Sequence, residues 1–303
     1  MASPTDAVLV TGASGFTGRR LMAELQARGV PAFGLDRRRE GPGLIAGDLS
    51  DAASLQRAIA ETAPRAVVHL AGVTFVGHAD VAETYDVNVT GTVRLLEALR
   101  RAPARPDAVI VASSATVYAR ADETPITEDH PLAPGSHYGM SKLLVEQLCG
   151  LYRDLPIRIV RPFNYTGPGQ SDKFLVPKIV SHFARDTGVI ELGSLDLYRD
   201  IGAVDDTVEA YVRLLERPDA GPPLNICSGR AVHLRSIVDD LRAISGKTME
   251  VVVNPAFVRP GEPRSIVGSR VRLEAAIGGW PLKPFREVLE DMYAAAAGAQ
   301  PVR

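Results

Sequence analysis

A tyrosine and a lysine stand four residues apart in the segment S-H-Y-G-M-S-K, residues 136–142. If this segment is helical, Tyr138 and Lys142 share one face, because residues four apart are neighbours on a helix surface. A phenol titrates at about 10, and an ammonium beside it stabilises the phenolate and lowers that pKa. Such a phenol can give or take the proton of an alcohol while hydride moves to or from a nicotinamide. The alternative is an ordinary pair of surface residues, and the elements around the pair decide between the two interpretations.

The first half of the chain alternates short apolar runs with helical patterns. The runs are rich in β-branched residues and apolar on both faces, as strands buried in a parallel sheet must be. They span residues 7–10, 31–36, 66–72, 107–114 and 157–163. Amphipathic patterns typical of helices lie between them, for example over 86–101 and 138–154. This alternation predicts an α/β fold with a doubly wound parallel sheet.

The pattern loosens after about residue 164, where proline and glycine become frequent. Helical patterns return near 204–217, 233–244 and 284–297, and strands are expected at 189–192 and 250–253. We expect a smaller α/β lobe that lies over the strand ends and binds the substrate. In this division the sheet domain comprises residues 1–163 and about 199–221, and the second lobe comprises residues 164–198 and 222–303.

The first strand leads directly into T-G-A-S-G-F-T-G, in which Gly12, Gly15 and Gly18 are spaced by three. Glycines in a turn between a strand and a helix let the backbone approach a pyrophosphate. The helix N-terminus then adds unpaired N–H groups and a positive dipole end. A tight turn without a ligand is the alternative. In this strand–turn–helix context the spacing predicts a dinucleotide site, and therefore a Rossmann domain.

Asp36 closes the second predicted strand, where a carboxylate can accept hydrogen bonds from the adenosine ribose hydroxyls. It favours NAD, because its charge would repel a 2′-phosphate. Arg37 and two further arginines follow at once and could neutralise such a phosphate, so NADP stays open. A solvated loop is the alternative for these arginines. Asp48, in G-D-L-S-D, could face the adenine amino group or serve as a helix cap or turn residue.

Together these motifs resemble the extended, nucleotide-sugar-active branch of the short-chain dehydrogenase/reductase superfamily. The matching segments occur in the family's order and cover most of the chain: T-G-A-S-G-F-T-G (11–18), Asp36, G-D-L-S-D (47–51), H-L-A-G (69–72), S-S-A-T-V-Y (113–118), Y-G-M-S-K (138–142) and R-P-F-N (161–164). The resemblance implies that Tyr138 is the acid/base and that Lys142 tunes its pKa and holds a ribose. It also implies that Ser114 holds the same substrate oxygen through its hydroxyl.

The resemblance further implies NAD(H) or NADP(H) as the cofactor. The residues implied to contact it are Gly12, Ser14, Gly15, Phe16, Thr17, Gly18, Asp36, Arg37, Asp48, Leu49, Leu70, Ala71, Gly72, Tyr138 and Lys142. Thr17 departs from the family's pattern, in which a branched aliphatic residue is usual, and Ala119 stands where glycine is usual. Neither departure removes a functional atom. Asn88 matches an asparagine of the family's fourth helix and is expected to be structural.

The residues after Ser114 bear on the type of reaction. Sugar-nucleotide 4,6-dehydratases of this branch carry carboxylates there, whereas this chain has Ala115 and Thr116, which leaves elimination without an acid/base pair. A 4-epimerase and a 4-ketoreductase use the same Ser-Tyr-Lys set, and S-S-A-T-V-Y is common among epimerases. A non-catalytic dinucleotide sensor is a remote alternative, because such relatives often lack the tyrosine or the lysine.

The later segments resemble the GDP-4-keto-6-deoxy-D-mannose reductases, which make GDP-D-rhamnose, and so favour a reductase over a 4-epimerase of the UDP-glucose/galactose type. These segments span 161–170, 174–177, 198–206, 225–229 and 259–269. The resemblance implies that Arg199 and Arg259 neutralise a diphosphate and that Glu262 accepts from a ribose. For Arg199, a surface pair with Asp200 is the alternative. The residues implied to bind the nucleotide sugar are Thr74, Ser114, Asn164, Val176, Lys178, Arg199, Arg259 and Glu262.

Composition argues against several other classes. The net charge of −2 provides no basic excess for nucleic acid, and no apolar run reaches the roughly 18 residues of a membrane span. Cys149 and Cys227 lie in no metal or disulfide motif and the six histidines are scattered, so no metal site is expected. We expect a cytoplasmic protein. A homodimer through the helices at 86–101 and 138–154 is also expected, although their apolar stripes fit packing on the sheet equally well.

Overall fold

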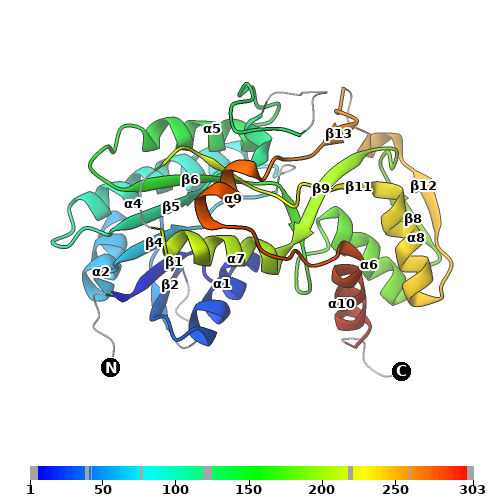
Figure 1. The fold of residues 1–303 in the computed structure, drawn as a ribbon, viewed down its shortest axis with the longest axis horizontal. Coiled ribbons are helices and arrows are strands. Elements are labelled where there is room, and N and C mark those ends of the chain that lie inside the picture. The colour runs from blue at the N-terminus through cyan, green and yellow to red at the C-terminus, as the bar shows by residue number, and fades with distance from the viewer. Residues whose placement is uncertain are drawn as a thin grey trace.

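The computed structural model describes residues 6–37, 41, 43–75, 78–118, 125–217, 221–258 and 261–298 of the 303-residue chain. The elements form two lobes that lie side by side (Figure 1). The larger lobe contains a seven-stranded sheet, and the smaller one contains the short sheets and the C-terminal helix. Among the helices in these ranges, none is both long and apolar enough to cross a membrane.

The seven strands of the larger lobe are all parallel and lie in the order β10-β6-β5-β4-β1-β2-β3. They are β1 (Val8–Thr11), β2 (Ala32–Asp36), β3 (Leu44–Ala46), β4 (Ala66–His69), β5 (Ala108–Ala112), β6 (Ile157–Pro162) and β10 (Leu224–Ile226). The predicted strands and the doubly wound fold class are confirmed. The chain runs outward from β1 to β3 and returns to β4 on the other side of β1, so the strand order reverses there. Ligands of doubly wound sheets bind outside the strand ends at such a reversal.

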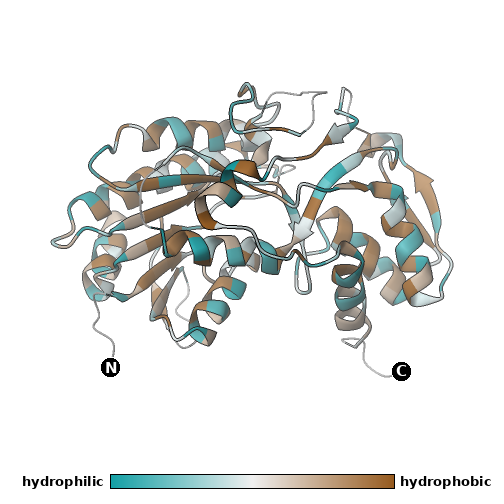
Figure 2. Ribbon diagram, viewed as in Figure 1, coloured by the Kyte–Doolittle hydropathy of each residue, from teal (hydrophilic) through white to brown (hydrophobic). Residues whose placement is uncertain are grey.

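Helices cover both faces of this sheet because its strands are apolar on both faces (Figure 2). In β1, Val8 and Val10 face one core with Tyr211, whereas Leu9 faces a second core with Leu95. The first core is covered by α1 (Phe16–Ala27), α7 (Val204–Leu215) and α9 (Val271–Ile277). The second is covered by α2 (Ala52–Thr62), α4 (Gly91–Arg100) and α5 (His137–Cys149).

The helices predicted at 86–101 and 138–154 are present with shifted limits. The first begins earlier, as α3 (Val81–Tyr85), and passes through a π-helical segment (Asp86–Thr90) into α4. The second, α5, ends at Cys149. Its N-terminus is set by Ser136, whose hydroxyl accepts a hydrogen bond from the backbone N–H of Gly139 at 3.1 Å.

The smaller lobe is organised around β9 (Tyr198–Ala203). This strand pairs with β7 (Asn164–Thr166), β11 (Ala231–His233) and β13 (Ser265–Ile266). A separate parallel pair comprises β8 (Val189–Leu192) and β12 (Glu250–Val253). One apolar core unites α6 (Leu175–Arg185), α8 (Leu234–Ser245) and α10 (Phe285–Gly298). The helices and strands predicted for this half are confirmed, whereas α6, β7, β9, β11 and β13 were not predicted.

Sheet membership divides the chain at different places from the predicted division. β9 belongs to the second sheet, although the prediction placed 199–221 in the sheet domain. β10 is the outer strand of the seven-stranded sheet and α9 packs with it, although the prediction placed 222–303 in the second lobe. The sheet that a strand joins is decided by its hydrogen-bonding partners, which the local sequence does not specify.

Candidate active site

A cleft of about 1470 Å³ runs from the glycine turn, past the carboxyl ends of the central strands, to the smaller lobe. Every residue predicted to bind cofactor or substrate lines this cleft, as far as the described residues extend. Arg259 lies outside the described residues. The fold therefore brings together residues that are spread over most of the chain.

The glycine turn has no room for larger residues. Gly12 has a φ of +69°, and a Cβ there would lie 2.8 Å from the backbone of Ala71. A Cβ on Gly18 would lie 2.2 Å from the carbonyl oxygen of Gly12. The turn thus packs backbone on backbone directly before α1, which leaves the first N–H groups of that helix at the cleft. This cradle fits the pyrophosphate of a dinucleotide.

Two aspartates line the adenosine end of this cradle. The Asp36 carboxylate accepts a hydrogen bond from the hydroxyl of Ser14, which ties the end of β2 to the glycine turn. A carboxylate placed there can accept from ribose hydroxyls as well. Asp48 also lines the cleft, and its Oδ1 accepts from the backbone N–H of Ser50 at 2.8 Å. Asp48 is therefore a turn residue in this structure, and α2 is capped by Asp51 instead.

Tyr138, Lys142 and Ser114 meet at the middle of the cleft. They are 9%, 6% and 9% exposed, respectively. The helix that carries the first two approaches the turn after β5 closely, because a Cβ on Gly139 would lie 2.6 Å from the carbonyl oxygen of Thr116. Tyr138 is hydrogen-bonded to Ser114. The interpretation as a surface pair is excluded, since both the phenol and the ammonium are buried.

Burial sets the protonation of these groups. Removal from water raises the pKa of Tyr138 to about 12, and the hydrogen bond with Ser114 opposes this only in part. The expected lowering of the tyrosine pKa by Lys142 is therefore wrong for this arrangement. The Lys142 ammonium donates to the carbonyl oxygen of Ala112 at 2.9 Å, and burial lowers its own pKa to about 8. At neutral pH the phenol is protonated and can act as an acid.

Thr17, which departs from the family's pattern, has a specific partner. Its Oγ1 lies 2.8 Å from the hydroxyl of Tyr165, and the Tyr165 ring stacks on Phe16 with 6.3 Å between centroids. The hydroxyl that replaces the usual aliphatic group thus links the glycine turn to β7. Tyr165 could not be predicted from the motifs, because its role depends on a contact across 148 residues of sequence.

His69 was also not identified as a supporting residue. It is buried between Thr11, whose hydroxyl lies 2.7 Å from Nδ1, and Thr92, whose hydroxyl lies 2.9 Å from Nε2. Burial lowers the pKa of His69 to about 3, so the ring is neutral. It joins the ends of β1 and β4 beneath the cofactor half of the cleft. In the sequence, His69 could have been found through its position in the H-L-A-G segment (69–72), which matches the family's pattern.

Asn88 supports the same region from the π-helical segment. Its side-chain amide exchanges hydrogen bonds with the backbone of Val73, at 2.8 and 3.1 Å, and donates to Ser141 at 2.9 Å. Ser141 lies next to Lys142 on α5, so Asn88 joins that helix to the loop after β4. These contacts agree with the structural role expected of Asn88.

The predicted substrate residues of the smaller lobe are largely engaged with one another or with backbone. Arg199 donates to Glu262 at 2.7 Å and to the carbonyl oxygens of Tyr198 and Pro263 at 2.7 and 3.1 Å. The alternative pairing with Asp200 is excluded, because that carboxylate accepts from Ser228, Gly229 and Gly268. Arg199 therefore holds the segment at 262–263 against β9.

Two further predicted residues contact the smaller lobe's backbone. Lys178 donates to the carbonyl oxygen of Glu191 at 2.9 Å, and its ammonium lies 4.9 Å from the centroid of the Phe257 ring. Asn164 donates from Nδ2 to the carbonyl oxygen of Asp200 at 3.2 Å. Phe257, which is 50% exposed and lines the cleft, was not predicted.

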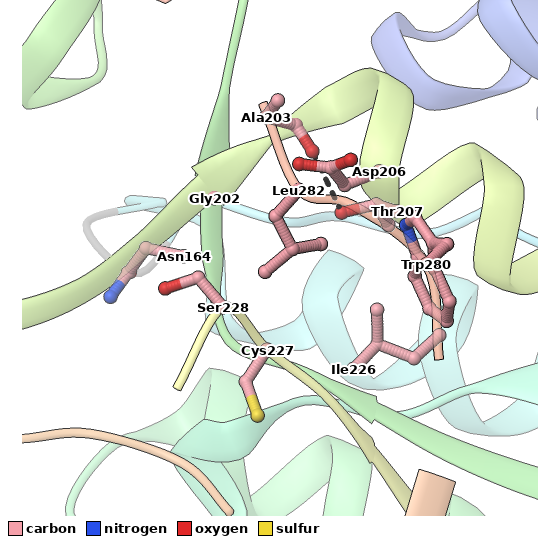
Figure 3. A pocket seen from close by; sticks show the side chains of 10 residues that line it. All are labelled: Asn164, Gly202, Ala203, Asp206, Thr207, Ile226, Cys227, Ser228, Trp280 and Leu282. Atoms are coloured by element: carbon pink, nitrogen blue, oxygen red, sulfur yellow. Dashed lines mark hydrogen bonds between the residues drawn. The ribbon is translucent and has the colours of Figure 1, made fainter. Parts of the chain in front are cut away.

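A second cavity lies behind Asn164, between β9, α7 and the segment around Trp280 (Figure 3). Asn164 and Ser228 border it together with the Trp280 indole. Its volume of about 10 Å³ matches a single water molecule. It cannot hold a sugar, so the large cleft is the candidate active site.

The chain matches the family described as NAD dependent epimerase/dehydratase over residues 8–227. GDP-6-deoxy-D-mannose reductase from Pseudomonas aeruginosa is 36% identical over 95% of this chain and 97% of its own. GDP-6-deoxy-D-talose 4-dehydrogenase from Aggregatibacter actinomycetemcomitans is 34% identical over 94% and 96%. UDP-glucose 4-epimerase from Azospirillum brasilense is 31% identical over 92% and 88%.

A solved structure extends this similarity to the whole fold. RMD from Pseudomonas aeruginosa, complexed with NADPH, has a TM-score of 0.86 and 33% identity, covering 98% of this chain and 99% of that one. The glycine cradle, the acidic residue at the end of β2 and the buried Ser-Tyr-Lys set occupy one cleft of the same fold. The chain therefore belongs to the NAD dependent epimerase/dehydratase family, within the extended short-chain dehydrogenases/reductases.

Proposed function

We propose that this protein reduces the 4-keto group of a nucleoside-diphosphate 4-keto-6-deoxyhexose with NADH or NADPH. The proposed reaction is GDP-4-keto-6-deoxy-D-mannose to GDP-D-rhamnose. The observation that carries the proposal is the buried, protonated Tyr138 beside Ser114 in a cleft shared by a dinucleotide cradle and a second lobe. The similarity to GDP-6-deoxy-D-mannose reductase supports the choice of sugar and nucleotide.

In the proposed reaction the cofactor supplies the hydride to C4. Tyr138 donates its phenolic proton to the oxygen at C4, since its raised pKa keeps that proton in place at neutral pH. Ser114 donates a hydrogen bond to the same oxygen and stabilises the charge that develops there. The Lys142 ammonium, on the same helix face as the phenol, would hold the nicotinamide ribose. Burial of all three groups strengthens these interactions by excluding water.

The two residues after the catalytic serine, Ala115 and Thr116, argue against elimination of water. Thr116 donates from Oγ1 to Ser114 Oγ at 3.0 Å, and its own backbone N–H donates to the same oxygen at 3.2 Å. A dehydratase needs a carboxylate pair at this point, and Ala115 and Thr116 provide none. Thr116 instead orients the serine hydroxyl, which serves a reductase or an epimerase.

At the other end of the cleft we propose contacts to the nucleotide sugar. Arg199 would offer its remaining N–H capacity to the diphosphate, a role that a guanidinium fork suits. Arg259 would bind the same diphosphate, and Glu262 would accept from the nucleotide ribose. Thr74, Asn164, Val176 and Lys178 complete the proposed set. Val176 is buried at the N-terminal end of α6 and would contribute apolar contact.

A 4-epimerase is the second candidate. The S-S-A-T-V-Y segment favours it, and an epimerase uses the same Ser114, Tyr138 and Lys142. The two candidates differ in net cofactor use: a reductase consumes NAD(P)H, whereas an epimerase reoxidises the reduced cofactor within each turnover. Among reductases, the face of C4 that receives the hydride decides the product, because 6-deoxy-D-mannose and 6-deoxy-D-talose differ in configuration at C4.

The test is to mix the purified protein with GDP-4-keto-6-deoxy-D-mannose and NADH or NADPH and to follow nicotinamide absorbance. We expect loss of reduced cofactor in equal amount to product, with the Tyr138→Phe variant as the blank. NMR of the product then distinguishes the rhamnose from the talose configuration. Interconversion of UDP-glucose and UDP-galactose without net cofactor use would establish the epimerase instead.

We also propose that the protein is a cytoplasmic homodimer. Met140 and Leu144 on α5 are each 39% exposed and Leu151, just beyond it, is 73% exposed, so this face is apolar and accessible. A helical face of this type is covered by a second copy in a dimer. Light scattering should give twice the monomer mass for the wild type, and Leu144→Glu should shift it toward the monomer. A monomeric wild type would contradict the proposal.

A further inference from the structure

A buried ion pair lies behind the catalytic turn and has no part in the proposed proton transfer. Arg161 on β6 binds Glu146 on α5 through two hydrogen bonds, Nε to Oε1 at 2.9 Å and Nη2 to Oε2 at 2.6 Å. Their side chains are 4% and 5% exposed. Charges buried this deeply need partners for their remaining polar atoms. Those partners therefore indicate what the ion pair holds in place.

The partners lie on both sides of Ser114. Ser113 donates from Oγ to Glu146 Oε1 at 2.5 Å. Beyond a short 3₁₀ turn (Ala115–Val117), Arg161 donates from Nη1 to the hydroxyl of Tyr118 at 3.0 Å. The guanidinium also lies over the Tyr118 ring, 5.0 Å from its centroid. One ion pair thus anchors the turn that carries Ser114 before and after that residue.

The network continues into the outer strand of the sheet. Tyr118 donates to Asn225 Oδ1 at 2.6 Å, and Asn225 is fully buried on β10. The backbone N–H of Asn225 donates to Glu128 Oε1 at 2.9 Å, and its side-chain Nδ2 donates to the carbonyl oxygen of Ile126 at 3.0 Å. Arg161 donates to the carbonyl oxygen of Glu128 at 3.0 Å. The neighbouring ends of β5, β6 and β10 are therefore joined by buried hydrogen bonds.

The hydrogen bonds that Ser114 makes within its own turn cannot perform the same task. Both come from Thr116, so they orient the serine hydroxyl relative to the turn. They do not place the turn relative to α5, which carries Tyr138 and Lys142. Glu146 follows Lys142 by one helical turn. The bond from Ser113 to Glu146 is thus a direct side-chain link between the strand end and the catalytic helix.

We propose that four residues, here called the serine clamp, are positioning residues for the catalytic serine: Ser113, Tyr118, Glu146 and Arg161. The serine clamp sets the distance between the Ser114 hydroxyl and the phenol of Tyr138. Both groups must reach one carbonyl oxygen, and a displacement of about 1 Å can reduce the rate roughly 100-fold. The inference rests on the proposed function, since it requires Ser114 to contact the substrate oxygen.

The first variant is Ser113→Ala, which removes one hydroxyl and leaves the ion pair intact. We expect kcat to fall roughly 10- to 100-fold, with the Kd of the cofactor unchanged. Thr62→Val is the matched control, because Thr62 is 1% exposed and its hydroxyl donates to the carbonyl oxygen of Ala58 at 2.8 Å, within α2. Melting temperatures of both variants separate a loss of stability from a loss of positioning.

The second arm combines Ser113→Ala with Ser114→Ala. If Ser113 acts through Ser114, the double variant has the same kcat as Ser114→Ala alone. Three outcomes would each overturn the inference. The loss of kcat in the double variant could be the product of the two single losses, or Ser113→Ala could keep the wild-type kcat. Thr62→Val could also lose as much kcat as Ser113→Ala. The assay uses whichever nucleotide sugar the wild-type protein converts, so a wrong substrate contradicts the proposed function only. If Ser114→Ala retains full kcat, the catalytic assignment of Ser114 fails, and the inference fails with it.

Discussion

Gly18 and Arg199 stand at opposite ends of the cleft and are held in place in different ways. At Gly18 the backbone itself forms the site, because the nearest atoms belong to Gly12 and Ala13 in the same turn. At Arg199 the site depends on a side chain that reaches Glu262, 63 residues further along the chain. In the cofactor half, backbone packs on backbone, both within the glycine turn and against Ala71 after β4. The substrate half depends instead on side-chain contacts between distant segments.

This difference has a consequence for substitution. In the cofactor half an added methyl group collides with backbone, which cannot move without loss of the turn. In the substrate half a substitution first breaks contacts within the protein, and the effect on a ligand follows from the segment that is released. Tyr138 and Lys142, at the centre of the cleft, depend on both kinds of contact. Their relative position is set by one turn of α5, but their pKa values are set by burial among distant segments.

The largest effect is expected at the centre, where both halves meet. Tyr138→Phe removes the acid and keeps the ring, so kcat should fall by roughly 10²- to 10⁴-fold while the Kd of the cofactor stays unchanged. Steady-state kinetics and cofactor fluorescence measure the two quantities. Turnover close to that of the wild type would contradict the acid/base assignment.

In the cofactor half, Gly18→Ala should weaken the binding of NADH and of NADPH to the same extent. The new Cβ would lie 2.2 Å from the Gly12 carbonyl oxygen, and overpacking of this kind costs about 1–3 kcal/mol, or roughly 5- to 150-fold in Kd. Gly298→Ala is the control, because no atom lies within 4 Å of a Cβ placed there. If both variants bind cofactor like the wild type, the turn is not the pyrophosphate site.

Asp36→Ala tests which cofactor this half selects. Loss of a charged acceptor should raise the Kd of NADH roughly tenfold. The Kd of NADPH should rise less, because the repulsion between the Asp36 carboxylate and the 2′-phosphate is removed at the same time. The ratio of the two Kd values is the measurement. An unchanged ratio would mean that Asp36 does not contact the ribose.

In the substrate half, Arg199→Lys keeps the charge but loses the guanidinium fork that binds Glu262 and two carbonyl oxygens. The KM of the nucleotide sugar should rise about 3- to 10-fold, with cofactor affinity unchanged. A rise in cofactor Kd of the same size would show that the two halves of the cleft do not act independently.

The smallest expected effect is a pH dependence at the centre. The pKa of Lys142 is lowered to about 8, so its ammonium is lost as the pH rises through that value. The pKa of Tyr138 is raised to about 12, so the phenol remains protonated over the same range. Activity should therefore decline above about pH 8. A pH profile of kcat/KM that stays flat up to pH 10 would contradict this assignment.

Several features could be predicted from sequence because they depend on neighbours in the chain. The (i, i+4) spacing placed Tyr138 and Lys142 on one helix face, and the glycine triplet placed a backbone turn between β1 and α1. Apolar runs predicted the central strands, since strands buried on both faces have no polar alternation. The expected division of the chain was less accurate, because the strands that define the second sheet are as short as two residues.

The fold class and the glycine turn could be predicted from local spacing, whereas the catalytic roles of Ser114, Tyr138 and Lys142 were implied by the resemblance of their motifs to the family. The partner of Arg199, the contact between Thr17 and Tyr165, the serine clamp and the raised pKa of Tyr138 became visible only in the folded chain. Each of these depends on groups that are far apart in the chain, or on how completely water is excluded. Periodicity and motifs report which residues are neighbours along an element, but not which elements will bury them.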